Sequence, residues 1–283
     1  MEATKKKKKI TLFDIVLGLI IGVICLLILI PVYKVIIDSF DLQSAYGMRL
    51  LPKKFGLDGY RSVFTNESLY RPLVVSFITT GLGTLIGLTL STLGGYVLIQ
   101  WEMPGRTFFA NFLLFTMIFN GGMIPTYLVV NGLGLTNTIW SVILMGALNV
   151  YHLVLMRNFF ESVPQSLFDA AAIDGCTPLK IFTSIVLPLS KAALASIGLM
   201  YAVNYWNDYT NFKLYITDSN FYNFQMKLRS IILGSDLPTA TGSATENTVK
   251  NAATIVAIIP FTFIYPFAQK YFVKGVNAGA VKG

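Results

Sequence analysis

The chain has 283 residues, of which 54% are hydrophobic and 13% are charged, and its formal net charge is +8. A soluble domain carries about 25% charged residues, so this composition excludes an ordinary soluble protein and indicates a membrane protein with long apolar runs. The positive charge does not indicate nucleic-acid binding, because five of the lysines lie together at Lys5–Lys9 and no basic stripe with interleaved aromatic residues follows.

The two cysteines and the single histidine indicate neither a disulfide framework nor a metal site. Cys25 lies in an apolar run, Cys176 lies far from it in the sequence, and His152 stands alone. A metal site needs several ligands at fixed spacing. We therefore expect no metal and no cofactor-binding residue on this chain.

The N-terminal segment predicts a basic cytoplasmic end followed by the first membrane span. Residues 1–11 form the basic N-terminus, and residues 12–37 form an apolar run long enough to cross a bilayer. A cleavable signal peptide also begins with charge and an apolar run, but this run is too long and no small-residue cleavage site follows it. The lysines at 5–9 place this end in the cytoplasm by the positive-inside rule, with lipid binding as a minor additional role.

Five further apolar runs predict the remaining spans. They extend over about 73–99, 108–130, 138–156, 188–206 and 251–272. With six spans the connection 38–71 lies outside, the turn 100–106 lies inside, and the tail 273–283 returns to the cytoplasm. This count agrees with the distribution of lysine and arginine over the short loops. The predicted fold class is an all-α membrane protein with six transmembrane helices.

Glycine patterns modify two of these spans. Gly83 and Gly87 form a GxxxG pair, which predicts close helix packing rather than a binding site. In the third span, the run from Asn120 to Pro125 contains two glycines and a proline, which weaken the helix. Backbone groups freed there must meet protein or water, so this run either lines a pathway or makes a packing kink.

The segment 161–188 predicts two short cytoplasmic helices between spans four and five. Pro164 suits a first helical turn, and Asp174-Gly175 is a stop at which glycine can adopt the left-handed conformation. Thr177-Pro178 repeats the start signal, and the second helix can extend to Leu187, where Pro188 turns the chain.

The first of these short helices has one polar and one apolar face. Gln165 and Asp169 share the polar face at i, i+4 spacing. The apolar face combines Leu167, Phe168, Ala171 and Ala172. A short helix of this kind between two membrane spans is suited to docking on another protein.

The same segment resembles the EAA signature of ABC importer permeases. That signature reads Glu-Ala-Ala, three residues, Gly, nine residues, Ile, one residue, Leu-Pro. Here the matching positions are Asp169-Ala170-Ala171, Gly175, Ile185 and Leu187-Pro188, and Asp169 replaces the glutamate. The resemblance covers about residues 72–272 and implies a type I ABC importer permease fold, with a cytoplasmic coupling helix between spans four and five.

Shorter stretches narrow the resemblance to MalG-type carbohydrate permeases. These are the Pro104-Gly-Arg turn, the Trp206-Asn207 pair and the ending Gly279-Ala-Val-Lys-Gly283. The runs Asn120–Tyr127 and Ala172–Cys176 are similar to the Lpl/Ytc-type branch of oligosaccharide permeases of Gram-positive bacteria. The resemblance implies import of a carbohydrate, of oligosaccharide size, across a bacterial plasma membrane, with both termini cytoplasmic.

The resemblance also implies an assembly and a coupling site. The partners would be a second, homologous permease, two ATPase subunits that hold ATP and Mg, an extracellular solute-binding lipoprotein, and the membrane lipid. The coupling helix would dock in a cleft of the ATPase. The implied ATPase-coupling residues are Leu167, Phe168, Asp169, Ala170, Ala171, Asp174, Gly175, Phe182, Ile185, Leu187 and Pro188.

Two details of that coupling site stay open. In the family the motif glutamate pairs with an ATPase arginine, and Asp169, one methylene shorter, would keep the pair by a small shift or through water. The tail from Lys274 to Gly283 either reaches the ATPase interface or forms a disordered end.

The end of span five carries the chemistry that suits a sugar, because aromatic rings stack on its apolar face and amides bond its hydroxyl groups. The candidate pathway residues are Asn204, Tyr205, Trp206, Asn207 and Asp208, with Asn120, Asn149 and His152 as further candidates. The alternative is an aromatic belt at the membrane interface, where Trp and Tyr collect. In the family, the partner permease can also hold most sugar contacts.

Catalytic motifs are absent from the sequence. There is no GxxxxGK[ST] phosphate loop, so ATP hydrolysis is expected on a partner chain, and there is no HExxH, paired-cysteine or GxSxG motif. We therefore expect no catalytic residue and no enzyme. The alternatives are an ABC permease for a non-sugar solute and an ion-coupled secondary transporter, which usually has mid-span carboxylates that are missing here. The identity of the sugar and of the partner chains does not follow from the sequence.

Overall fold

The computed structural model describes residues 11–44, 47, 49–100, 103–234, 240 and 242–280, with side chains through Pro266 and at Gln269. Two expectations lie outside the described residues and side chains: the basic end at Lys5–Lys9 and the ATPase contact of the tail from Lys274 to Gly283. The chain divides into two compact units. We call residues 1–66 and 237–256 the N-terminal unit, and residues 67–236 and 257–283 the bundle unit.

The N-terminal unit contains a long apolar helix, α1 (Leu12–Phe40). Thr11 caps it, and the side chain of Asp14 in turn accepts a hydrogen bond from the Thr11 N–H, at 2.9 Å. Its apolar side chains are exposed on all sides along most of its length, as expected of a helix that faces lipid. The predicted first span, 12–37, lies within α1.

A folded connection joins α1 to α2 (Asp58–Thr65) and to the first turns of α14 (Glu246–Ala280). The buried carboxylate of Asp41 accepts the N–H groups of Gln43 at 3.0 Å and Lys54 at 3.1 Å. The main-chain oxygen of Asp41 accepts the Thr248 hydroxyl at 2.6 Å. These bonds connect the described residues around Asp41 with Lys54 and with the start of α14.

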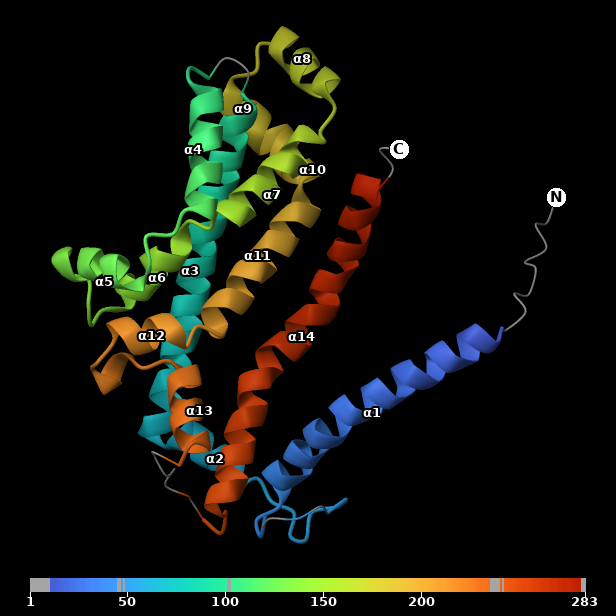
Figure 1. The fold of residues 1–283 in the computed structure, drawn as a ribbon, viewed down its shortest axis with the longest axis vertical. Helices are drawn as coiled ribbons and strands as arrows, with labels where there is room; N and C mark the ends of the chain where they lie inside the picture. The colour runs from blue at the N-terminus through green and yellow to red at the C-terminus, as the bar shows by residue number, and fades with distance from the viewer. Residues whose placement is uncertain are drawn as a thin grey trace. The chain divides into compact units, whose positions relative to one another are not determined.

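The bundle unit is organised around α3 (Glu67–Ile99), against which α6, α7 and α11 pack (Figure 1). Its other elements are α4 (Arg106–Ile118), α5 (Met123–Gly132), α6 (Ile139–Ala147), α7 (Val150–Glu161), α8 (Gln165–Ile173), α9 (Pro178–Ile181), the π-helix η1 (Phe182–Val186), α10 (Leu187–Leu189), α11 (Lys191–Trp206), α12 (Thr210–Tyr215), the 3₁₀-helix η2 (Ser219–Phe221), α13 (Phe224–Ile232) and the rest of α14. Within the bundle unit α8 lies at one end, and α12 and α13 lie toward the other.

The described helices provide up to six membrane crossings. Leu12–Phe40, Glu67–Ile99 and Glu246–Pro266 are each long and apolar enough to cross alone. Three bent pairs pass the same test: α4 with α5 at 114°, α6 with α7 at 42°, and Pro178–Leu189 with α11 at 80°. The third predicted span, 108–130, is therefore two helices, and the glycine run separates them at Gly122, whose φ is +93°.

The GxxxG pair of α3 accommodates two tyrosines of α11, so the predicted close packing is confirmed. A Cβ at Gly87 would lie 2.6 Å from the Tyr201 ring, and one at Gly83 would overlap the Tyr205 ring. Tyr201 and Tyr205 are both buried. Since a side chain at either glycine would exclude a ring, the two glycines determine how closely α11 approaches α3.

The prediction that Pro188 turns the chain is wrong by two residues. The helix continues through Pro188 to Leu189, and the 80° bend falls at Ser190. Proline is tolerated here because it occupies the first turn of α10, directly after the π-helix, where the usual i→i−4 bonding is already interrupted. Pro164 is likewise the N-cap of α8 rather than its first helical residue.

Candidate functional site: a docking helix and an amide-lined pocket

The ends of α8 follow from its sequence. The helix ends where Gly175 adopts φ +73°, and the N–H groups of Gly175 and Cys176 bond the carbonyl oxygens of Ala172 at 3.0 Å and Ala171 at 2.9 Å. These two hydrogen bonds close the C-terminus of α8 as a Schellman-type cap does. The stop predicted at Asp174-Gly175 is confirmed, and the cap holds α8 as a discrete short rod.

One side of α8 packs on the bundle and the other is exposed. Ala171 is buried, and Phe168 and Cys176 are half-buried against the same apolar core. Ile173 is 86% exposed and Leu167 is 40% exposed. Two exposed apolar side chains on one short helix are available for docking to another protein.

The polar face of α8 carries the predicted pair. Gln165 Nε2 donates to Asp169 Oδ1 at 3.1 Å, and both side chains are exposed. The structure therefore places the carboxylate of Asp169 at the surface, beside a cavity of about 750 Å³ that also contacts Arg106 and Glu161.

The remaining motif residues connect α8 to the bundle. Phe182 is buried in the core formed by α3, α7 and α11, and Ile185 and Leu187 pack against that core. Phe182 and Ile185 lie in the π-helix, which sequence reasoning did not anticipate. A π-helical turn such as this five-residue one is rare and is frequently found at functional sites.

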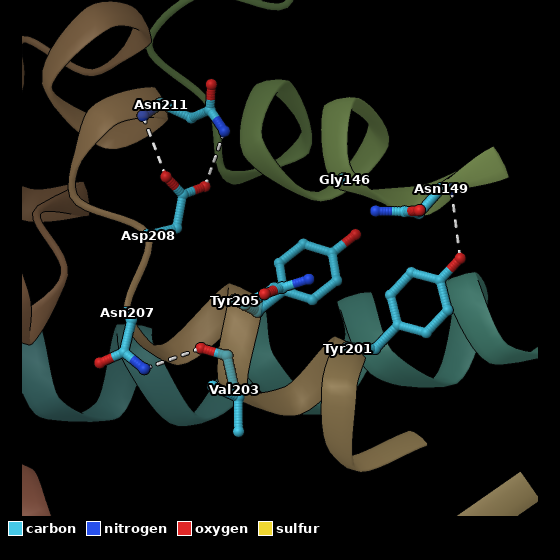
Figure 2. Close-up of a pocket in the computed structure, with 9 residues that line it drawn as sticks. Gly146, Asn149, Tyr201, Val203, Tyr205, Asn207, Asp208 and Asn211 are labelled. Atoms are coloured by element: carbon cyan, nitrogen blue, oxygen red, sulfur yellow. Dashed lines mark hydrogen bonds between the residues drawn. The ribbon is translucent and has the colours of Figure 1, made fainter. Parts of the chain in front are cut away.

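A second cavity, of about 370 Å³, lies where α11 ends beside α6 and α7 (Figure 2). Its walls combine side-chain amides with one carboxylate and two tyrosines. The lining residues are Gly146, Asn149, Tyr201, Val203, Asn204, Tyr205, Asn207, Asp208 and Asn211. The structure thus brings together five predicted pathway residues from two parts of the sequence: Asn149, Asn204, Tyr205, Asn207 and Asp208.

The two tyrosines bond backbone groups of α6 and of the break between α6 and α7. The Tyr205 hydroxyl donates to the carbonyl oxygen of Ile143 at 2.7 Å, and the Asn149 N–H donates to the Tyr201 hydroxyl at 3.2 Å. Ser91 of α3 lies 2.7 Å from the same Tyr201 hydroxyl. A bent span can persist in a membrane only when the backbone groups at its break are paired, and at this break the Tyr201 hydroxyl pairs with the Asn149 N–H.

Asp208 forms the charged part of the wall, just beyond the end of α11. Its two carboxylate oxygens accept the Asn211 N–H at 3.0 Å and the Asn211 Nδ2 at 2.9 Å. Burial raises the pKa of the Asp208 carboxyl, which its hydrogen bonds with Asn211 only partly oppose. Asn207 Nδ2 donates to the Val203 carbonyl oxygen at 3.0 Å, so its side-chain oxygen remains oriented away from the helix end (Figure 2).

Three predicted pathway residues do not line this pocket. Trp206 is buried on the other side of α11, where Nε1 donates to the Ala257 oxygen at 3.0 Å. His152 is buried with its ring 4.3 Å from that of Tyr201. Asn120 is exposed and accepts the Gly122 N–H at 2.8 Å. In the structure these three make packing or capping contacts, and their place on the pathway stays a prediction.

Tyr205 and Trp206 do not have the exposure that an aromatic belt at the membrane interface would need. Tyr205 is 3% exposed and Trp206 is 2% exposed within the chain, whereas belt residues lie at the lipid–water boundary. Sequence reasoning missed Tyr201 and Asn211. A signal existed for both, since Tyr201 lies four residues before Tyr205 on one helical face, and Asn211 lies three residues after Asp208, at capping distance.

Comparison with known proteins agrees with this geometry. Residues 103–278 match the family described as "Binding-protein-dependent transport system inner membrane component". The polygalacturonan/rhamnogalacturonan transport system permease protein YtcP of Bacillus subtilis (strain 168) is 41% identical over 282 residues, which cover 96% of this chain and 99% of that protein. Protein LplC of the same organism is 39% identical over 280 residues, covering 96% and 95% of the two chains.

A solved structure shows the same fold. The crystal structure of a bacterial ABC transporter involved in the import of the acidic polysaccharide alginate contains a chain that is 30% identical, with a TM-score of 0.85 over 94% of this chain and 100% of that one. The predicted all-α, type I importer permease fold is confirmed by this match. The chain belongs to the family of binding-protein-dependent inner-membrane transport components, which are the membrane-spanning permease subunits of ABC importers and not enzymes.

Proposed function

We propose that this permease imports a carbohydrate of oligosaccharide size and that the amide-lined pocket is part of its pathway. The observation that carries the proposal is the gathering of Asn149, Asn204 and Asn207 around Tyr205 in one cavity. Amides can donate to and accept from sugar hydroxyl groups, and a tyrosine offers both a ring and a hydroxyl. The names of the relatives support this class, since YtcP is named for polygalacturonan and rhamnogalacturonan and the solved transporter for alginate.

The assembly we propose contains a second, homologous permease, two ATPase subunits and an extracellular solute-binding lipoprotein. The family description supports a binding protein. The absence of a phosphate loop from the sequence supports separate ATPases, which would hold ATP and Mg. The exposed side of α8, which carries Ile173 and Leu167, is the surface we assign to the ATPase.

The proposed mechanism transmits motion along one continuous stretch of chain. ATP binding closes the ATPases and moves α8 as a rigid rod. The movement passes through α9, η1 and α10 to the bend at Ser190, and from there along α11 to Asn204 and Tyr205 at its far end. The pathway opens outward to receive the saccharide from the binding protein, and hydrolysis resets it.

The proposed topology places the chain in a bacterial plasma membrane with both termini cytoplasmic, and the two Bacillus relatives favour a Gram-positive host. Residues 1–11 and 273–283 are then cytoplasmic, 12–37 is the first span, and 72–272 is the permease domain. Reporter fusions after Gly283 test this orientation, and a reporter active only outside the cell would overturn it.

Uptake by the complete importer tests the substrate class. Cells that express this chain with its partner chains would be given labelled oligogalacturonides, arabino-oligosaccharides and, as a non-sugar control, an oligopeptide. We expect uptake of at least one saccharide, dependent on ATP and insensitive to collapse of the proton gradient. Uptake of the peptide alone would support an ABC permease for a non-sugar solute, and saccharide uptake abolished by proton-gradient collapse would support an ion-coupled carrier.

A further inference from the structure

Tyr96 attaches the α8 end of α3 to the segment that follows α8. Its hydroxyl donates to the main-chain oxygen of Pro178 at 2.8 Å, and its ring lies 4.6 Å from the Phe182 ring. Tyr96 is 7% exposed and Phe182 is 6% exposed. One side chain therefore makes a polar and an aromatic contact with the same short stretch of chain, from a helix that is distant in the sequence.

That stretch has little structure of its own to hold it in register. α9 is four residues long and is capped by Thr177, whose hydroxyl accepts the Lys180 N–H at 3.4 Å. The π-helix η1 follows at once and begins at Phe182. A single turn that leads into irregular helical bonding cannot transmit a displacement rigidly by itself, because short helices are only marginally stable without tertiary contacts.

The helix α3 also contacts Tyr201, a residue that lines the pocket. Five residues before Tyr96, the Ser91 hydroxyl lies 2.7 Å from the Tyr201 hydroxyl. One turn earlier in α3, Gly87 lies directly against the Tyr201 ring. Since α3 is helical without interruption from Glu67 to Ile99, a movement applied at Tyr96 reaches the pocket-lining tyrosines without passing through the bend at Ser190.

A small charged cluster strengthens the same junction. Glu161 at the end of α7 pairs with Arg157 at 2.8 Å and with Arg106 at 3.6 Å. Arg106 Nε also donates to the Leu98 oxygen near the end of α3, at 2.7 Å. These bonds connect the ends of α3 and α7 with the start of α4. Tyr96 joins this junction to Pro178 and Phe182, and Phe160 of α7 also meets the Phe182 ring, at 6.5 Å.

We infer that Tyr96 is a positioning residue for energy coupling: its hydroxyl and ring keep α9 and η1 in register with α3, so that α8 moves α3 and α11 together. This inference rests on the proposed function, in which α8 docks on the ATPase, and adds a second route beside the one along α11. Without the hydroxyl, α9 can slip against α3, and ATPase movement is lost before it reaches the pocket.

The test reads the pocket directly and needs only Mg-ATP as the probe. In a chain carrying Cys25→Ser and Cys176→Ser, a single Val203→Cys places a thiol on the exposed pocket wall. The maleimide labelling rate of the assembled importer is measured without nucleotide and with Mg-ATP and vanadate. Tyr96→Phe keeps the ring and removes the hydroxyl, and Phe182→Leu removes the ring contact if the first variant fails to assemble. Tyr151→Phe removes the hydroxyl of an exposed tyrosine on α7 and is the matched control.

We expect the labelling rate to change with nucleotide in the parent and in Tyr151→Phe. In Tyr96→Phe the nucleotide-dependent change should shrink by about threefold to tenfold, the effect of one hydrogen bond on an equilibrium. An unreduced change in Tyr96→Phe, or in Phe182→Leu where that variant is used, would overturn the positioning role alone. A parent importer that hydrolyses ATP without any change at residue 203 would contradict the proposed coupling itself, and the positioning role with it.

Discussion

The Tyr205 hydroxyl donates to the carbonyl oxygen of Ile143 across 2.7 Å, inside the chain and next to the break between α6 and α7. Tyr205→Phe would remove this buried hydrogen bond, which contributes about 0.5–1.5 kcal/mol to the folding free energy. We expect a lower thermal unfolding temperature in detergent. Tyr70→Phe, at a half-exposed tyrosine of α3, is the control and should unfold like the parent chain.

The glycines of α3 offer a second stability test with a control on the same helix. A methyl group at Gly87 would lie 2.6 Å from the buried Tyr201 ring, whereas one at Gly81 meets no atom within 4 Å. Gly87→Ala should destabilise the bundle unit by about 1–3 kcal/mol through overpacking, while Gly81→Ala should be neutral or slightly stabilising because alanine favours the helix. Equal unfolding temperatures for the two variants would contradict the close packing of α3 and α11.

The environment of Asp41 in the N-terminal unit predicts that its contribution to the stability of the fold depends on pH. Burial tends to raise the pKa of its carboxyl, but the N–H groups of Lys53, Gln43 and Lys54 and the charge of Arg49 together outweigh burial and hold the pKa below its ordinary value. A carboxyl with a lowered folded-state pKa stabilises the fold above the unfolded-state pKa, near 3.9, and loses that contribution as the pH falls toward the folded-state value.

Asp41→Asn should therefore lower the unfolding temperature of the detergent-solubilised protein at pH 7, and the difference from the parent should shrink as the pH falls below about 4. Thermal unfolding at a series of pH values measures this. A difference that stays constant down to pH 3 would show that the charge of Asp41 is not what stabilises this part of the N-terminal unit.

The pocket predicts a change in transport affinity rather than in stability. Asn204 is exposed to the cavity, so Asn204→Ala should raise the KM for saccharide uptake by about threefold to tenfold through loss of one hydrogen bond. Asn131→Ala replaces an exposed amide at the end of α5 and should leave the KM unchanged. If both variants match the parent, the sugar contacts lie on the partner permease instead.

Local features of this fold were predictable because they depend on neighbouring residues. The stop at Gly175, the Gln165–Asp169 pair and the weakness of the helix near Gly122 all follow from turn chemistry and helical spacing. The grouping of Asn204, Tyr205, Asn207 and Asp208 followed from their proximity in the sequence.

Orientation and bending were not predictable, because they depend on distant contacts. Trp206 faces away from the pocket since its indole bonds Ala257 and meets Phe77 and Phe261, which adjacency to Tyr205 cannot indicate. The π-helix before the bend at Ser190 begins at Phe182, whose ring packs against Tyr96 of α3, and such a distant contact is not visible in the sequence. The sequence shows that residue 188 is a proline, but it does not show the contacts that allow the helix to continue past this proline.

The central claim is that α8 couples a separate ATPase to the pocket, and Asp169→Lys tests it most directly. The assembled importer would be reconstituted with its binding protein, and ATP hydrolysis measured with and without the saccharide that it transports. We expect Asp169→Lys to lose most of the saccharide-stimulated hydrolysis while Glu67→Lys, a charge reversal at the start of α3 with an 84% exposed side chain, retains it. Stimulation equal to the parent in a fully assembled Asp169→Lys complex would contradict the docking role of α8.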